Sequence, residues 1–223
     1  MLQTIFEMTM KLQLAYCPTA CSMATYILLK EANAEFETLD INLGKGEHLS
    51  PEYLKINPKA KVPALIINGK PLTENLAIQL WIAQAYPNSN LMPADSFEYF
   101  QAISVMSWCS SAIHPKLTQQ ARPERYNDQP GTSDRIKALG SDSMFEFFAI
   151  ANEMLNAREW FFDHFTCADA YFYWCFKRGA AFGRDQSVFQ NCHQHMLRME
   201  KRASVQALMK HDEEVKLRFS QAQ

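Results

Sequence analysis

The chain has 223 residues, of which 48% are hydrophobic and 21% charged, and its formal net charge is −2 at pH 7. This length allows one large domain or two small ones, and the composition is that of a folded soluble protein rather than a basic nucleic-acid binder. With no apolar run of about 18 residues, no export signal and six scattered cysteines, we expect a cytoplasmic protein with reduced thiols that does not bind membranes.

The first half of the chain alternates strand-like and helix-like patterns. Ser50-Pro51 is a typical helix start, and Asn68-Gly69 is a strong hairpin signal. The predicted elements are a strand over 11–16, a helix over 22–32 capped by Ser22, a strand over 36–41, a helix over 50–57, strands over 64–67 and 70–72, and a helix capped by Thr73 that runs to about 85. This order predicts a small mixed sheet with helices packed on it.

The second half shows helical patterns only, after a segment at 88–95 that is rich in Pro, Asn and Ser. All nine arginines of the chain lie in this half. The predicted helices run from a capping box at Asp95 to about 111, over 141–158, from a second box at Thr166 to Gly179, over 187–202 and over 204–211, with a loop at 122–134. The helix after Thr166 is apolar nearly all round, so we place it at the domain centre.

Two cysteines, Cys17 and Cys21, flank the end of the first predicted strand. Their Cys-x3-Cys spacing differs from the Cys-x-x-Cys of dithiol oxidoreductases, and spacing alone fits two buried structural thiols equally well. Cys21 immediately precedes a helix, whose free N–H groups and dipole stabilise a thiolate. We therefore expect a lowered pKa and reactivity at Cys21, and a structural role for Cys17.

Two further segments suit an extended, peptide-like ligand. Most X-Pro bonds are trans, but a cis bond at Val62-Pro63 would expose the Val62 backbone for pairing with such a ligand. Glu74 can pair with an ammonium group and Asn75 can hydrogen-bond a carboxylate, which together suit an α-amino-acid headgroup at a helix start. Routine helix capping is the simpler explanation of Thr73, Glu74 and Asn75.

Other residue types with chemical potential have plainer explanations. His114 lies near an apolar helix end, where histidines are more often structural. Cys192, His193 and His195 are of metal-ligand type, but nothing completes a four-ligand set, so we predict no metal site. The sequence has no Gly-rich phosphate loop and no Gly-x-Ser-x-Gly motif.

Taken in order, these segments resemble the cytosolic glutathione S-transferases, and PTACS resembles their bacterial beta class. The resemblance rests on MKLQLAYCPTACSMATYILLKEA, INPKAKVPAL, LTENLAIQLWIAQAYP and LMPAD, and continues more weakly through SSAIHPKL, RPERY and FTCADAYFYW. It implies an α/β thioredoxin-like domain followed by an all-α helical-bundle domain, in a homodimer. The expected parts are an N-terminal extension over 1–10, a glutathione-binding domain over 11–88 and a helical domain over 96–215.

The resemblance also implies two catalytic residues. Cys21 matches the beta-class cysteine that contacts the glutathione sulfur. His114 matches a histidine of the second domain that points into the active site, although Pro115 follows it where a lysine is common.

The resemblance further implies a set of glutathione-binding residues. Val62, next to a cis Pro63, matches the residue that pairs with the cysteinyl backbone of glutathione. Glu74 matches the acid that binds the γ-glutamyl end, and Asn75 stands where the family has Ser. Lys45 matches the lysine near the glycine carboxylate.

The function implied by the resemblance is that of a glutathione transferase. Glutathione serves as co-substrate, no metal is needed, and the thiolate attacks small hydrophobic electrophiles, as in detoxification. A nucleophilic Cys21 also suggests a glutathione-dependent thiol–disulfide activity through a mixed disulfide. Two alternatives are a non-catalytic binding or regulatory protein of the same fold and a dithiol enzyme that pairs Cys17 with Cys21.

Overall fold

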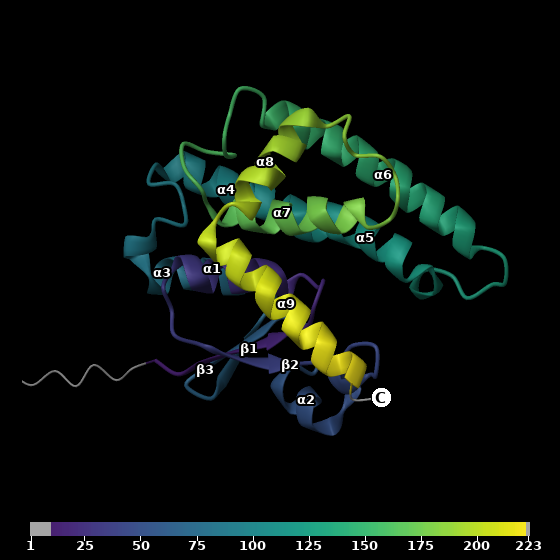
Figure 1. The fold of residues 1–223 in the computed structure, drawn as a ribbon, viewed down its shortest axis with the longest axis horizontal. Coiled ribbons are helices and arrows are strands. Elements are labelled where there is room, and N and C mark those ends of the chain that lie inside the picture. Colours follow the sequence, from purple (N-terminus) through teal and green to yellow (C-terminus); the bar gives the residue numbers. More distant parts are fainter. Residues whose placement is uncertain (1–9, 222–223) are drawn as a thin grey trace, which may run out of the picture.

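The computed structural model describes residues 10–221, in which a small sheet is followed by a bundle of helices (Figure 1). The elements are β1 (Leu12–Tyr16), α1 (Ser22–Glu31), β2 (Glu37–Asp40), α2 (Pro51–Ile56), β3 (Ala64–Ile67), β4 (Lys70–Thr73), α3 (Asn75–Ala85), α4 (Ser96–Trp108), α5 (His114–Ala121), α6 (Ser133–Met154), α7 (Cys167–Ala180), α8 (Gln190–Glu200) and α9 (Ala203–Gln221). The predicted fold class is confirmed. The predicted extension over 1–10 lies, except for its last residue, outside the described residues.

The sheet has the strand order β2-β1-β3-β4, with β1 parallel to β2 and the other neighbours antiparallel. Leu14 in the central strand pairs with Thr38 on one side and Leu65 on the other. The hairpin between β3 and β4 turns at Asn68 and Gly69, whose φ angles of 49° and 82° are those of the predicted tight turn.

The side chains of β1 point alternately to the two faces of the sheet. Leu14 and Tyr16 belong to the main core, together with side chains from α1 and α3. Ala15 and Cys17 point to the opposite face, where Tyr53 of α2 covers them. Because successive side chains of a strand point to opposite faces, residues 14–17 contribute to the packing of helices on both sides of the sheet.

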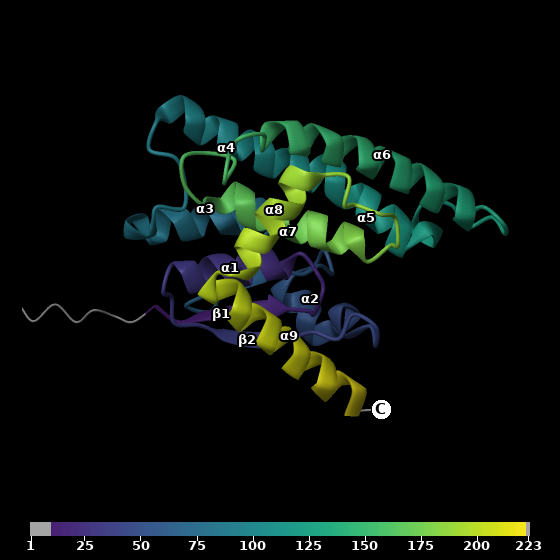
Figure 2. The same cartoon turned by 45° about the horizontal axis from the view of Figure 1, so that its top comes forward.

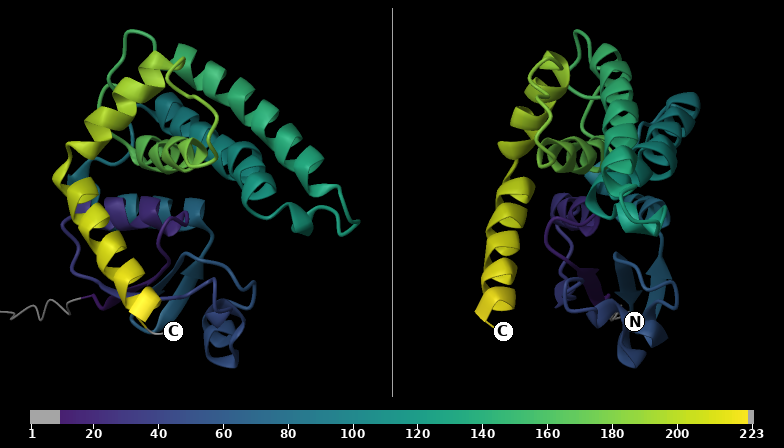
Figure 3. Two further views of the ribbon diagram at one scale, coloured as in Figure 1. Left: turned by 45° about the vertical axis from the view of Figure 1, so that its right-hand side comes forward. Right: turned by 90° about the vertical axis from the view of Figure 1, so that its right-hand side faces the viewer.

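The main core continues from the sheet into the helical half without a break. Figure 2 shows α1 and α3 between the sheet and the helices α4 to α8. The predicted central helix is α7, which is buried along nearly its whole length and begins with the predicted capping box of Thr166 and Asp169. The last helix, α9, returns to lie beside α1 and the sheet (Figure 3).

Two predicted helix starts in the first half are wrong. Cys21, not Ser22, occupies the N-cap of α1, because the Ser22 hydroxyl is used by the backbone of Cys17, donating to its O and accepting from its N at 3.2 Å each. Thr73 ends β4 and does not cap α3, which begins after Glu74.

The helical half differs from its predicted boundaries because helices continue through residues that usually end them. Instead of ending near 111, α4 passes through a π-helical segment, Cys109–Ile113, directly into α5. Pro115 is tolerated in the first turn after this segment, where a missing N–H removes little hydrogen bonding. Similarly, α6 begins at Ser133, so the predicted loop over 122–134 is shorter, and α9 runs beyond 211 to Gln221.

Two glycines inside helices mark close packing rather than helix ends. Gly179 lies within α7, where an added Cβ would be 2.6 Å from Gln186 Nε2 and 2.8 Å from Phe148 Cε2. In α6, a Cβ on Gly140 would lie 2.9 Å from the Cβ of Gln119. The prediction that Gly179 ends the helix is therefore wrong. The lack of a side chain at this position allows Phe148 and Gln186 to pack closely against α7.

Among the helices within residues 10–221, none has the length and apolar character needed to cross a bilayer.

Candidate functional site

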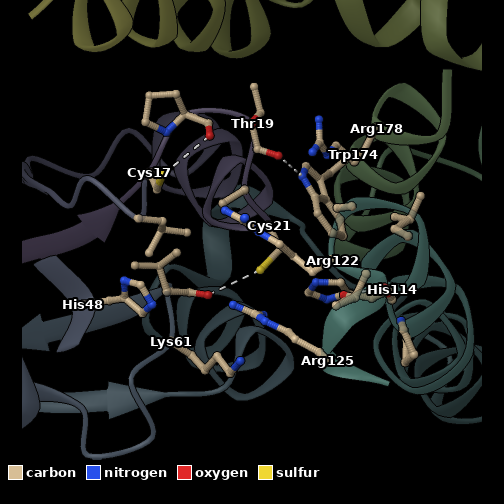
Figure 4. Close-up of a pocket in the computed structure, with 18 of the residues that line it drawn as sticks. Cys17, Thr19, Cys21, His48, Lys61, His114, Arg122, Arg125, Trp174 and Arg178 are labelled. Atoms are coloured by element: carbon tan, nitrogen blue, oxygen red, sulfur yellow. Dashed lines mark hydrogen bonds between the residues drawn. The ribbon is translucent and has the colours of Figure 1, made fainter. Parts of the chain in front are cut away.

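A cleft of about 570 Å³ opens between the loops at one edge of the sheet half and the helices α5 and α7 (Figure 4). Its sheet-side wall comes from the loop 17–21 and from residues 60–62, and its helical wall includes His114 and Trp174. Three of the predicted site residues line it, and these are Cys21, Val62 and His114.

Cys21 lies at the N-cap of α1, with only 7% of its surface exposed. Its thiol donates to the backbone O of Val62 at 3.4 Å, which joins the end of the loop 17–21 to the start of β3 (Figure 4). The Val62–Pro63 peptide bond is cis, as the resemblance implies. The structure thus brings Cys21 and the Val62 backbone together at the floor of the cleft.

The prediction of a lowered Cys21 pKa is wrong. Burial raises the pKa of this thiol to about 12, although its own backbone N–H at the helix start favours the thiolate. Burial likewise raises the pKa of Cys17, whose thiol points to Pro18 O at 3.6 Å. The free-energy cost of removing the thiolate from water is larger here than its stabilisation by the N-terminus of the helix.

The raised pKa predicts slow alkylation of Cys21. In a Cys17→Ser variant, which leaves one cysteine in this loop, we expect the rate with iodoacetamide to rise about tenfold per pH unit from pH 7 to 10 without a plateau, because the thiolate fraction grows throughout that range. Mass spectrometry of the peptide that carries Cys21 measures the rate, and circular dichroism verifies that the fold persists. A plateau between pH 7 and 9 would contradict the assignment.

His114 begins α5 directly after the π-helical segment and lies inside the helical wall. Its ring packs edge-on against Trp174 with centroids 4.6 Å apart, and its Nδ1 lies 3.5 Å from the Tyr171 hydroxyl. Burial, with a smaller contribution from Lys61, lowers the pKa of His114 to about 4. The imidazole is therefore neutral at pH 7, and it can serve as a hydrogen-bond partner but not as a cation.

Asn75 does not face the cleft. Its buried amide accepts from the Thr25 hydroxyl at 2.7 Å and donates to Cys21 O at 3.1 Å. Where the sequence suggests a ligand contact, the structure shows a side chain that fixes α3 to the start of α1.

Glu74 and Lys45 lie outside the lining of the cleft. Glu74 is 68% exposed, pairs with Lys59, and has a φ of 75°, which is costly for a residue other than glycine and is often found at binding sites. Lys45 is exposed on the turn next to Gly44, and Gly44 itself lines the cleft. Pro63 is buried and is not among the residues that line the cleft.

Sequence reasoning missed the basic and aromatic part of the cleft. Lys61, Arg122, Arg125 and Arg178 all line it, and Trp174 donates through Nε1 to the backbone O of Thr19 at 3.0 Å. The available signal was RPERY, which belongs to the weaker part of the resemblance and holds two of these arginines.

Two of the three residues named earlier as metal-ligand types, Cys192 and His195, make structural contacts. His195 is buried with Nε2 3.0 Å from Asp169 Oδ1, and the Cys192 thiol donates to Phe148 O at 3.6 Å. Within the described part of the chain, no three His, Cys, Asp or Glu side chains are grouped so that they could hold a metal ion.

Comparison with known proteins decides the family. Residues 10–84 match the model of the glutathione S-transferase N-terminal domain. The beta-class glutathione S-transferase of Sphingomonas chungbukensis is 31% identical with a TM-score of 0.80, and the match covers 90% of this chain and 98% of that one. This chain belongs to the cytosolic glutathione S-transferase family. The predicted family is thus confirmed over nearly the whole length of a relative.

Two other members of the family match over similar lengths. Glutathione S-transferase GstA of Escherichia coli O157:H7 is 28% identical over 199 residues, which cover 87% of this chain and 96% of that protein. A glutathione transferase homologue from Sulfitobacter, solved with bound glutathione, has 26% identity and a TM-score of 0.86, covering 90% and 98% of the two chains. The match therefore includes the helical half, where the sequence resemblance is weaker.

Proposed function

We propose that the protein is a glutathione transferase that joins the sulfur of glutathione to a small electrophile. The observation that carries this proposal is the corner formed by Cys21, Val62 and the cis Pro63, which opens into a cleft faced by α5 and α7. Relatives similar along their whole length are glutathione transferases, including one solved with glutathione, which supports catalysis over the non-catalytic alternative.

Glutathione binding would change the hydrogen bonding of Cys21. The Val62 O that now accepts from the Cys21 thiol is the acceptor that an extended peptide ligand needs for its own N–H. When the cysteinyl N–H of glutathione takes that oxygen, the Cys21 S–H is released and can donate to the glutathione sulfur. In this arrangement Cys21 acts as a protonated donor, which its raised pKa favours.

The transfer itself needs only the thiolate of glutathione and the electrophile. The thiol proton leaves to solvent, a sulfur lone pair forms the new C–S bond, and the leaving group departs with its bonding electrons. Each unit by which the site lowers the glutathione thiol pKa stabilises the thiolate by about 1.4 kcal/mol. In this proposal the neutral His114, which lines the cleft, would hydrogen-bond the reacting groups from the helical side.

The remaining parts of the proposal follow the family. Residues 11–88 would bind glutathione and 96–215 would hold the electrophile, in a cytoplasmic homodimer. Glu74 and Lys45 would bind the two ends of glutathione from the rim of the cleft. The thiol–disulfide activity of Cys21 stays a prediction, and the raised pKa of this thiol disfavours it.

Calorimetric titration with reduced glutathione tests the proposal. Glu74→Gln removes one charge at nearly constant shape, so we expect binding to weaken about 10- to 100-fold, as for loss of a charged hydrogen bond. Lys59→Gln is the matched control, because it removes the partner of Glu74 and leaves the carboxylate available. It should bind glutathione as tightly as the wild type or up to about fivefold more tightly.

The outcomes separate the parts of the proposal. If wild-type protein does not bind millimolar glutathione, the proposed function is wrong. If it binds and Glu74→Gln binds equally well, only the role of Glu74 is wrong.

A further inference from the structure

The cleft is lined by an excess of positive charge. Lys61, Arg122, Arg125 and Arg178 all belong to its lining, and among the described residues no aspartate or glutamate does. Among the ion pairs within residues 10–221, none involves any of these four side chains. In the described part of the chain, these four cations therefore have no carboxylate within ion-pair distance.

Three of these cations, Arg122, Arg125 and Arg178, belong to the helical half of the chain. Arg122 and Arg125 flank the short turn at Pro123 that follows α5, and this turn is held because the Tyr126 hydroxyl donates to Pro115 O at 2.8 Å. Figure 4 shows the Arg125 side chain reaching into the cleft below the Cys21 thiol.

Arg178 approaches the same space from another helix. It lies in the last turn of α7, half-buried, with its guanidinium 5.0 Å from the centre of the Phe182 ring. Burial lowers the pKa of Arg178, so a bound anion would relieve part of the cost of keeping this charge there.

The positive charge of the cleft also affects a neighbouring titratable group. Burial lowers the pKa of His48, and Arg125, Lys61 and Arg122 lower it further. His48 and His114 are the other titratable bases of the lining, and neither supplies a negative charge.

Glutathione alone does not balance these charges. It carries two carboxylates and one ammonium group, a net charge of −1 that becomes −2 as the thiolate. Four fixed cations exceed that charge, and the excess lies on the helical wall, where the electrophile would bind. On the same stretch of α5, Ala121 is exposed beside the arginines, and the buried Leu117 also belongs to the lining.

We propose that the second substrate is a small electrophile that carries a carboxylate or another oxyanion, which Arg122, Arg125 and Arg178 bind. This inference rests on the proposed function and narrows the expected class of small hydrophobic electrophiles. The apolar body of the substrate packs against α5, and its anionic group is held by guanidinium donors, whose fork geometry suits carboxylate oxygens.

Matched glutathione conjugates test the inference without requiring turnover. S-(4-carboxybenzyl)glutathione and S-(4-carbamoylbenzyl)glutathione differ by one charge at nearly equal size, and S-methylglutathione has no group for the arginines to bind. By calorimetry, we expect the carboxylate to bind at least about tenfold more tightly than the amide, with a preference that falls as salt is raised.

Variants assign the preference to named residues. Arg122→Gln and Arg125→Gln should each reduce the preference for the carboxylate to about threefold or less, and should leave binding of S-methylglutathione within about twofold. Arg135→Gln is the control, because Arg135 is an exposed arginine of α6 outside the cleft lining. Arg135→Gln should change neither the preference for the carboxylate nor the binding of S-methylglutathione.

Each contrary result has a distinct meaning. Equal binding of the carboxylate and the amide overturns this inference and leaves the glutathione transferase proposal standing. Equal loss of S-methylglutathione binding in the arginine variants also overturns it, because the arginines then serve the carboxylates of glutathione. Failure of all three conjugates to bind overturns the proposed function and this inference together.

Discussion

Replacing Asp169 by alanine should lower the free energy of unfolding by about 4 kcal/mol or more, and the Tm by about 8–16 °C. The Asp169 carboxylate is fully buried and serves four donors. Oδ2 accepts from the backbone N of Thr166 at 2.8 Å and from its hydroxyl at 3.0 Å, and Oδ1 accepts from Phe161 N at 3.1 Å and lies 3.0 Å from His195 Nε2. Alanine leaves all of these buried groups without their partner.

The size of this effect depends on burial, and a second aspartate nearby provides the control. Asp163 is 79% exposed and pairs with the neighbouring His164. Asp163→Asn should therefore change stability by less than about 0.5 kcal/mol. Urea denaturation of wild type and both variants measures the difference. An Asp169→Ala protein within about 1 kcal/mol of wild type would show that the network does not stabilise α7.

Strands and turns of the first half could be predicted because their signals are local. Alternation over 11–16 and the Asn68-Gly69 turn depend on neighbouring residues only, and both are as expected. The N-cap of α1 could not be predicted, because the hydroxyl of Ser22 is used by Cys17 five residues earlier. Local pattern does not tell which of two polar groups a hydroxyl will meet.

The helical half was harder to predict because its boundaries depend on packing. Gly140 and Gly179 lower helix propensity, yet both lie inside helices where another chain segment approaches too closely for a side chain. Pro115 would normally end a helix, but the preceding π-helical segment lets the chain continue. Only contacts between distant segments distinguish these glycines and this proline from true helix ends.

The sheet half of the candidate site could be predicted, together with His114 of the helical wall. Cys21 and Val62 follow from motifs with fixed spacing, and both line the cleft. Arg122 and Arg178 reach the same cleft from segments 56 residues apart, and no spacing rule connects them. Even for Cys21, the prediction of a lowered pKa was based on the helix start alone. The sequence did not show how completely the thiol is buried, and burial raises its pKa.

Replacing Asp212 by alanine should cost about 3 kcal/mol of stability and should weaken glutathione binding at the same time. The Tyr16 hydroxyl, which is buried under α9, donates to Asp212 Oδ1 at 2.6 Å, and Thr19 N donates to the same oxygen at 3.1 Å. Burial, reinforced by Asp212, raises the pKa of Tyr16, so the phenol stays protonated and needs an acceptor. Alanine leaves two donors unpaired, each at about 1–3 kcal/mol.

The effect on binding comes from the backbone of Thr19. This β-branched residue has a φ of 63°, which is unfavourable unless its surroundings hold it, and the Asp212 and Trp174 hydrogen bonds hold its N and O. Without Asp212, the loop 17–21 can relax to another conformation and displace Cys21 from Val62. Loss of stability alone would leave the glutathione Kd of the folded protein unchanged, so a weaker Kd identifies the positioning role.

Asparagine at position 212 separates hydrogen bonding from charge. Asp212→Asn retains an oxygen that accepts from both Tyr16 and Thr19, but it loses the pair with Lys216, whose Nζ lies 2.5 Å from Oδ2. Because Lys216 is half-exposed, this pair contributes little, and Lys216→Met should have an equally small effect. We therefore expect Asp212→Asn to remain within about 1 kcal/mol of wild type and to bind glutathione normally. If asparagine is as damaging as alanine, the carboxylate charge rather than the shared acceptor positions the loop that carries Cys21.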